Sequence, residues 1–114
     1  MDGEGVFSWP NGDKYSGVYI NGRRNGLGDM TYGDGDVYKG AWRNGQYHGQ
    51  GEYKWINGDV YTGDWRDGVP HGYGEFIYGP HKAGEKYSGQ YEQGFRHGFG
   101  TYYYADGRKA QQVM

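Results

Sequence analysis

Large aromatic side chains and polar side chains alternate along much of this chain with a period of two residues. Tyr38, Gly40 and Trp42 fall on one side of an extended backbone, and the residues between them fall on the other. Residues 51–55 and 61–65 show the same division. A period of two is typical of β-strands with one buried face, whereas an amphipathic helix would space its apolar residues three or four positions apart. The pattern therefore predicts half-buried strands rather than helices.

Turn signals separate the predicted strands. Four short turns built on Asn-Gly or Asp-Gly are expected, because these pairs tolerate the positive φ angles of tight hairpins. They lie at residues 11–13, 34–36, 57–59 and 106–108. Four longer loops are expected at residues 21–26, 44–49, 67–72 and 93–98. Strand, loop, strand and turn thus follow one another along the chain.

These elements belong to one repeated unit. The motif Tyr-x-Gly-x-aromatic-x-x-Gly begins at Tyr15, Tyr38, Tyr61 and Tyr87, so the starts are 23, 23 and 26 residues apart. We predict one array over residues 2–109, with a C-terminal tail at 110–114. The array comprises a partial repeat at 2–14 and full repeats at 15–37, 38–60, 61–86 and 87–109. The expected fold is all-β, an elongated single-layer antiparallel sheet of repeated hairpins that grows by about 10 Å per repeat.

Composition alone would argue against a folded domain, because Leu, Ile, Val and Phe together supply only 14 of 114 residues. The chain instead carries 14 Tyr, 4 Trp and 4 Phe at fixed repeat positions, and these rings can provide the buried surface. Its 25 Gly also recur at fixed positions, unlike the glycines of a flexible linker. We therefore expect rings on one strand to lie across glycines on the next.

The aromatic face of the sheet is the candidate binding site. No predicted helix is available to cover it, and an exposed apolar patch of this kind marks a partner site. We expect the floor of this groove to be structural and its rims to bind. The candidate groove residues are Tyr15, Tyr19, Tyr38, Trp42, Tyr53, Trp55, Tyr61, Trp65, Phe76, Tyr78, Tyr87, Tyr91, Tyr102 and Tyr104.

Charge and residue chemistry narrow the function further. The net charge of −2 comes from 12 basic and 14 acidic residues mixed along the chain, which leaves no basic stripe for nucleic acid. His48, His71 and His97 share one repeat position, but copies about 10 Å apart cannot ligate one metal ion, so we expect each ring to bond to backbone at a bend. No nucleophile lies beside a base in the pattern. We expect no metal site, no cofactor and no catalytic residue, and therefore a protein that is not an enzyme.

The segment Tyr-x-Gly-x-Trp-x-x-Gly-x-x-His-Gly-x-Gly, at residues 38–51 and 61–74, resembles the MORN (membrane occupation and recognition nexus) repeat. The resemblance extends over residues 2–109 and implies an array of hairpins used for scaffolding, dimerisation or partner binding. The chain departs from the pattern at Asn25, which stands in place of His, and in a three-residue insertion within residues 79–84. Tyr19 and Tyr91 stand where the repeat often has Trp.

The resemblance implies a structural or adaptor protein in a cytoskeletal or ciliary assembly, with the axoneme as the most specific expectation. The expected partner is a protein helix or extended segment. Sheet edges near Val6–Trp9 and Phe99–Tyr104 could also pair with another copy or another chain. An anionic-lipid-binding membrane tether and an accessory module of a larger enzyme are the alternatives. Without cysteine, a signal-peptide pattern or an apolar span, we expect a cytoplasmic location.

Overall fold

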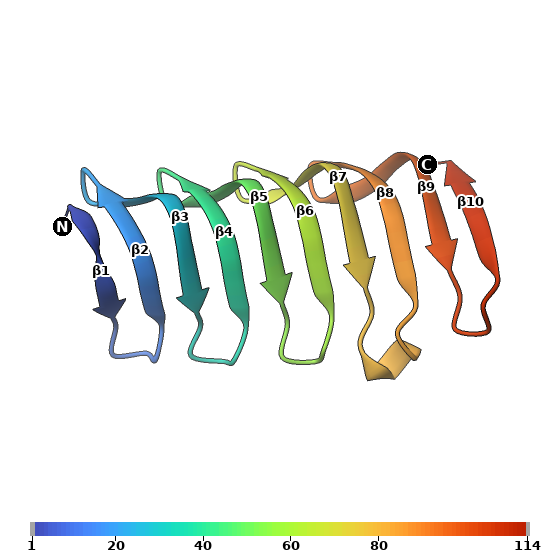
Figure 1. Ribbon diagram of the computed structural model, residues 1–114, viewed down its shortest axis with the longest axis horizontal. Helices are drawn as coiled ribbons and strands as arrows, with labels where there is room; N and C mark the ends of the chain where they lie inside the picture. Colours follow the sequence, from blue (N-terminus) through green and yellow to red (C-terminus); the bar gives the residue numbers. More distant parts are fainter. Residues whose placement is uncertain (1, 114) are drawn as a thin grey trace.

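The computed structural model describes residues 2–113, which form a single sheet of ten strands and one short 3₁₀ turn (Figure 1). The strands are β1 (Gly3–Ser8), β2 (Lys14–Ile20), β3 (Arg23–Thr31), β4 (Val37–Arg43), β5 (Gln46–Lys54), β6 (Val60–Arg66), β7 (Val69–Ile77), β8 (Lys86–Glu92), β9 (Phe95–Tyr103) and β10 (Lys109–Val113). The 3₁₀ turn η1 covers Pro80–Lys82.

The sheet has the simplest possible topology. Each strand pairs antiparallel with its neighbours in the chain, from β1 at one edge to β10 at the other. The chain measures 49 × 26 × 16 Å, and Figure 1 shows the strands side by side along the longest axis. Ten strands about 4.8 Å apart account for that length. The prediction of an all-β, elongated, single-layer array of hairpins is confirmed.

The two strands of each repeat are joined by tight turns, not by the longer loops that the sequence suggested. Asn21 and Gly22 have φ angles of 52° and 76°, and the equivalent pairs in the other repeats are also left-handed. Two residues with positive φ make a type I′ turn, whose twist suits a hairpin. The second strand therefore begins immediately, at Arg23 in β3 and at Gln46 in β5. The expected six-residue loops are wrong.

The end of the array also differs from the prediction. Lys109–Val113, most of which we expected to lie in a tail, form β10 and pair with β9. Phe99–Tyr104 are consequently covered, so the prediction of an open edge there is wrong, and the terminal edge of the described chain is β10. Strand β1 forms the other edge, as predicted for Val6–Trp9. Residue 114, the last of the predicted tail, lies outside the described residues.

Each repeat carries one irregularity at the same place in its ladder. In the second repeat, Gly40 pairs with Gly51 and Trp42 pairs with Tyr47, so one residue of β4 faces three of β5. The same shift follows Gly17, Gly63 and Gly89. Gly49 provides the extra length at φ 96°, a conformation that other residues rarely adopt. The longer second strand bends here and carries its side chains over the aromatic face.

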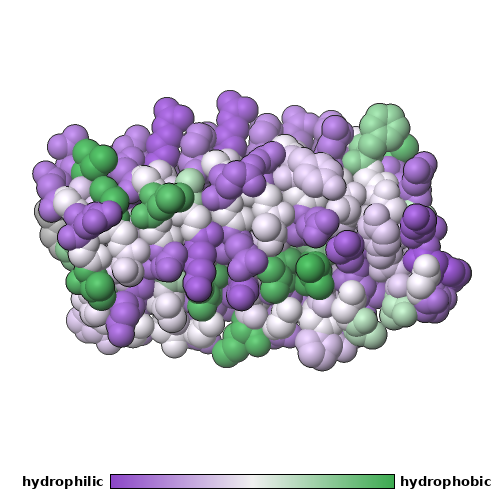
Figure 2. Space-filling view, viewed as in Figure 1, coloured by the Kyte–Doolittle hydropathy of each residue, from purple (hydrophilic) through white to green (hydrophobic). Residues whose placement is uncertain are grey.

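Glycines from every strand up to β9 pair in a row across the sheet, including Gly17 with Gly28 and Gly28 with Gly40. The rings that cover this row form the core. The buried apolar residues are Tyr15, Tyr19, Met30, Tyr38, Trp42, Tyr61, Trp65, Tyr87, Tyr91 and Tyr102. Figure 2 shows a mainly hydrophilic surface with apolar residues in small separate groups. Among residues 2–113 there is no helix long and apolar enough to cross a membrane.

Candidate partner-binding groove

The floor of the groove is a row of four buried tyrosines. Tyr15, Tyr38, Tyr61 and Tyr87 have no exposed surface, and each ring lies over a glycine of the next strand. Their hydroxyl groups donate to backbone carbonyls at the ladder irregularities, for example from Tyr38 to the Ala41 oxygen at 2.8 Å. An unpaired carbonyl at a buried irregularity would be costly, so these phenols complete the backbone hydrogen bonding. The floor is structural.

A second row of buried rings locks neighbouring repeats together. Trp42 packs edge-on against Tyr38 of its own repeat and Tyr15 of the preceding repeat, with ring centroids 5.1 and 5.5 Å apart. Its indole Nε1 donates to the Gly28 carbonyl at 3.1 Å, and Trp65 makes the same bond to Gly51. Tyr19 and Tyr91 occupy this row in the outer repeats. Edge-to-face contacts of this kind stabilise beyond simple burial.

Partly exposed rings stand along the groove beside these rows. A hollow of about 340 Å³ opens in the middle of the array. It is lined by Tyr47, Tyr53, Trp55, Tyr61, Trp65, Pro70, Phe76, Tyr91 and Gly94. Two of its lining rings, Trp55 and Phe76, pack against each other with their centroids 5.4 Å apart. Of the remaining predicted groove residues, Tyr78 and Tyr104 pack at the partly buried margin of the core, and Tyr102 is buried.

The sequence prediction missed one row of groove residues. Arg24, Tyr47, Pro70 and Arg96 pair with Tyr19, Trp42, Trp65 and Tyr91 respectively, so they occupy one repeat position. The sequence pattern places this position within the expected loops. The Asn-Gly pair at residues 44–45 could have shown that the strand resumes before Tyr47. The two central members of this row, Tyr47 and Pro70, line the hollow.

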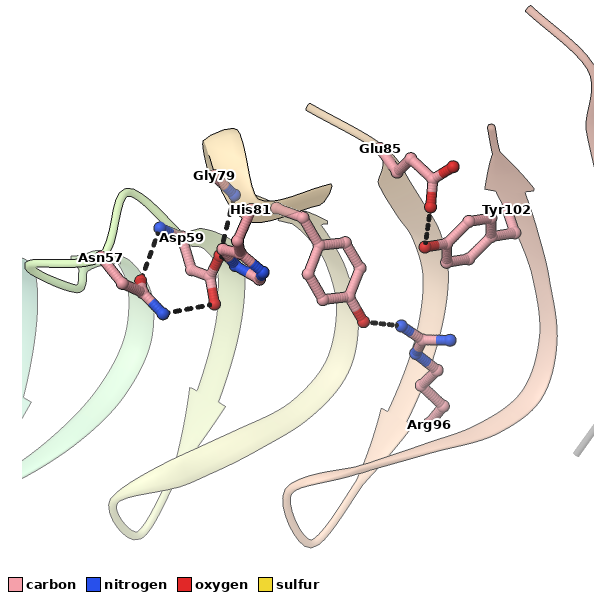
Figure 3. Close-up of polar contacts among 8 residues, drawn as sticks. Asn57, Asp59, Gly79, His81, Glu85, Arg96 and Tyr102 are labelled. Atoms are coloured by element: carbon pink, nitrogen blue, oxygen red, sulfur yellow. Dashed lines mark hydrogen bonds and ion pairs between the residues drawn. The ribbon is translucent and has the colours of Figure 1, made fainter. Parts of the chain in front are cut away.

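The two arginines of this row lie against rings. The Arg24 guanidinium carbon is 4.9 Å from the centre of the Trp42 ring and 5.9 Å from that of Tyr15. The Arg96 guanidinium carbon is 4.4 Å from the centre of the Tyr87 ring, and this side chain also donates to the Tyr78 hydroxyl (Figure 3). Such distances are those of cation–π contacts.

Carboxylates at the short turns tie each repeat to the next. Asp13, Asp36 and Asp59 each accept a backbone N–H from the residue 20 positions later, at 2.8–2.9 Å. Glu85 replaces them after the insertion and accepts the Ala105 N–H at 3.0 Å. Asp36 also accepts the Tyr53 hydroxyl at 2.8 Å. Each link crosses from one repeat to the following one, so these charges are part of the scaffold.

The insertion folds onto one of these links. In η1 the His81 Nε2 atom lies 2.6 Å from Asp59 Oδ1, beside the Gly79 N–H (Figure 3). Burial opposes ionisation of Asp59, but the bonds from Gly79 and His81 outweigh it and hold the pKa of this carboxyl below its usual value. The Tyr102 hydroxyl donates to Glu85 at 2.7 Å, which lowers the pKa of Glu85.

The repeated histidine position provides a second link between repeats. The Asp67 N–H bonds to His48 Nδ1 at 3.4 Å, and the Gln93 N–H bonds to His71 Nδ1 at 3.3 Å. The Asn44 N–H bonds in the same way to Asn25 Oδ1 at 3.0 Å, so the amide oxygen of Asn25 takes the place of the imidazole nitrogen. The expected backbone bond is confirmed for His48 and His71. His97 differs, because its Nε2 atom pairs with Glu92 at 3.0 Å.

The phenols of the aromatic face resist ionisation. Burial raises the pKa of Tyr91 to about 12, against the lowering effect of Arg96. Burial also raises the pKa values of Tyr38, Tyr47 and Tyr61.

Within residues 2–113, no group of three or more histidine or acidic side chains is placed to hold a metal ion. The aromatic face thus combines uncharged phenol and indole rings with the cationic side chains of Arg24 and Arg96.

A comparison with protein-family models gives this architecture a name. The model of the MORN repeat matches residues 1–14, 15–37, 38–60, 61–81 and 87–107. The chain is therefore a member of the MORN repeat family. Its repeats form a module for binding proteins or membranes, and the family is generally non-enzymatic. No curated protein matches the chain.

Proposed function

We propose that this chain is a non-enzymatic adaptor that binds a segment of a protein partner in the aromatic groove. The observation that carries the proposal is the hollow of about 340 Å³, whose walls are rings and a proline. Open pockets lined by aromatic side chains are where interfaces concentrate their binding energy. The buried floor positions this hollow, and the partly exposed Tyr53, Trp55 and Phe76 offer the contact surface.

The setting that we propose for this adaptor is a cytoskeletal or ciliary assembly in the cytoplasm. The support is the resemblance of the repeats to those of proteins in such assemblies. Imaging the tagged chain in ciliated cells tests the setting directly. Signal along the axoneme or another cytoskeletal structure is expected, whereas a uniform plasma-membrane signal would contradict the setting and favour a lipid tether.

A crosslinking experiment with a matched control tests the groove. A photoreactive phenylalanine analogue replaces Trp55, which lines the hollow, or Ile56, its 74% exposed neighbour outside the hollow. In cell extract, we expect the analogue at position 55 to crosslink to a discrete partner protein. The analogue at position 56 should not crosslink to that protein. Recovery of that protein should fall at least tenfold with Trp55→Ser and stay unchanged with Ile56→Ser. Equal recovery with both variants, at unchanged melting temperatures, would refute the groove as the binding site.

A further inference from the structure

Two arginines stand at opposite ends of the row that borders the hollow. The row contains Arg24, Tyr47, Pro70 and Arg96, one residue from each full repeat. Three repeats separate the two arginines, which corresponds to about 30 Å of sheet. Between them lie the apolar Tyr47 and Pro70, both of which line the hollow. The groove thus presents cation, apolar surface and cation in that order.

Neither guanidinium has an acidic partner in the described part of the chain. The ion pairs formed within residues 2–113 involve His48, His81, His97, Lys54, Lys86 and Arg108, but not Arg24 or Arg96. The Nε atom of Arg24 is buried and has no hydrogen-bond partner among the described residues. Arg24 and Arg96 are both half-buried, so they lie in the groove wall, not in open solvent.

The rings around these arginines hold them without neutralising them. A cation–π contact contributes about 0.5–2 kcal/mol and leaves the full positive charge in place. A guanidinium has planar N–H donors that can form two parallel hydrogen bonds to the two oxygens of a carboxylate. A partly desolvated guanidinium with no counter-ion is therefore a site that favours an incoming carboxylate.

The groove also favours a helix over a β-strand as its occupant. Its surface is made of side chains, and the backbone groups of the inner strands are already paired within the sheet. An extended segment lying there would find no strand edge with which to pair, whereas a helix satisfies its own backbone hydrogen bonds. A helix that spans about 30 Å has about 20 residues.

We propose that the partner segment is an amphipathic helix of about 20 residues with an apolar stripe and acidic residues near both ends. The stripe packs into the hollow, and one Asp or Glu pairs with Arg24 and another with Arg96. This inference rests on the proposed function, because it specifies the chemistry of a partner for the same groove.

Selection from a displayed library of randomised 20-residue helices tests the proposal. The bait is the full chain, either unchanged or as the Arg24→Gln, Arg96→Gln double variant. Helices selected on the unchanged chain should carry an apolar stripe and be enriched at least fivefold in Asp and Glu near both ends. Helices selected on the double variant should keep the stripe and lose the acidic enrichment. For individual helices, binding to the double variant should be at least tenfold weaker.

A matched control separates the two arginines from net charge. The Arg23→Gln, Arg66→Gln double variant removes the same charge from two exposed positions and should select the same acidic helices as the unchanged chain. The Arg24→Lys, Arg96→Lys double variant keeps both positive charges and should retain part of the acidic enrichment. This result would show that the loss with glutamine comes from the missing charge and not from disturbed packing. Melting curves of all variants report folding.

The outcomes distinguish this inference from the proposed function. An apolar stripe without acidic enrichment on the unchanged chain would overturn the inference and leave the groove proposal standing. Failure to select any helix would overturn the inference, whereas the groove proposal is decided separately by crosslinking from position 55. The last outcome concerns phosphatidylserine vesicles. If the unchanged chain and the Arg23→Gln, Arg66→Gln control bind them but the Arg24→Gln, Arg96→Gln variant does not, the helix inference is overturned in favour of a lipid ligand.

Discussion

The ring of Tyr38 lies directly over Gly51 of the neighbouring strand, where an added Cβ atom would be only 2.5 Å from Tyr38 Cζ. The same relationship joins Tyr15 with Gly28, Tyr61 with Gly74 and Tyr87 with Gly100. The sheet can therefore bury four large rings in a single layer because glycine leaves the space above its backbone free.

Replacing Gly51 by alanine should be strongly destabilising for this reason. Forcing a methyl group against a buried ring typically costs about 1–3 kcal/mol, because the ring and the backbone must move apart. Gly5→Ala is the matched control, since its Cβ atom would lie 3.4 Å from the nearest atom, Cζ of Phe7. Urea unfolding should show a loss for Gly51→Ala and a change below about 0.5 kcal/mol for Gly5→Ala. Similar midpoints for the two variants would contradict this account.

The hydroxyl group of Tyr38 should contribute separately from its ring. Tyr38→Phe keeps the ring over Gly51 but removes the donor to the Ala41 carbonyl at 2.8 Å. We expect a loss of about 1 kcal/mol in the free energy of unfolding, the usual net value of one hydrogen bond. Tyr103→Phe, at a partly exposed position on the opposite face, should change stability by less than about 0.5 kcal/mol. An unchanged unfolding midpoint for Tyr38→Phe would show that the hydrogen bond to the Ala41 carbonyl does not contribute to stability.

Asp36 and Asp34 allow a test of the links between repeats. Asp36 accepts the Ile56 N–H and the Tyr53 hydroxyl from the next repeat, whereas Asp34 accepts only the Asp36 N–H within its own turn. Bonds to a charged acceptor contribute about 1.5–3 kcal/mol, so Asp36→Ala should be much the more destabilising change. Hydrogen exchange should also become faster at the Ile56 amide. Equal effects of Asp34→Ala and Asp36→Ala on unfolding would be incompatible with a link.

The fold should become less stable at high pH. Burial raises the pKa of Tyr91 from its ordinary value near 10 to about 12, so the folded chain holds this proton more tightly than the unfolded chain does. The stability gained is fully present below about pH 10 and is lost as the pH rises toward about 12. Tyr38 and Tyr61 shift in the same direction. Melting temperatures between pH 8 and pH 12, with tyrosine ionisation followed by ultraviolet absorbance, would detect the loss, and a flat profile would disprove it.

The repeat, the strands and the aromatic face could be predicted because each depends on local rules. Period-two alternation and Asn-Gly turns act over a few residues, and the array repeats them. The strand β10 could not be recognised in this way. Ala110 and Gln112 replace the tyrosine and glycine that define a first strand elsewhere, yet they pair with Tyr102 and Gly100 through backbone groups. Backbone pairing requires no particular side chain, so the motif is absent where the strand is present.

The groove was predicted less completely than the fold. Fourteen aromatic residues were assigned to it without saying which form its floor, and the structure places Tyr15, Tyr38, Tyr61 and Tyr87 there, with no exposed surface. The row that includes Tyr47 and Pro70 was missed because glycines inside its strand resembled a loop. Gly49, with its φ of 96°, lengthens the strand without ending it. A glycine in the sequence does not reveal whether the backbone turns or only bends.

The hydrogen bonds from turn carboxylates to backbone N–H groups 20 positions later join each repeat only to its nearest neighbours. The stabilising interactions therefore act only between adjacent repeats, as in other linear repeat proteins. Duplication or deletion of one 23-residue unit would lengthen or shorten the groove by about 10 Å and require no new kind of contact. The number of repeats would then set the length of the partner segment in the binding mode that we propose.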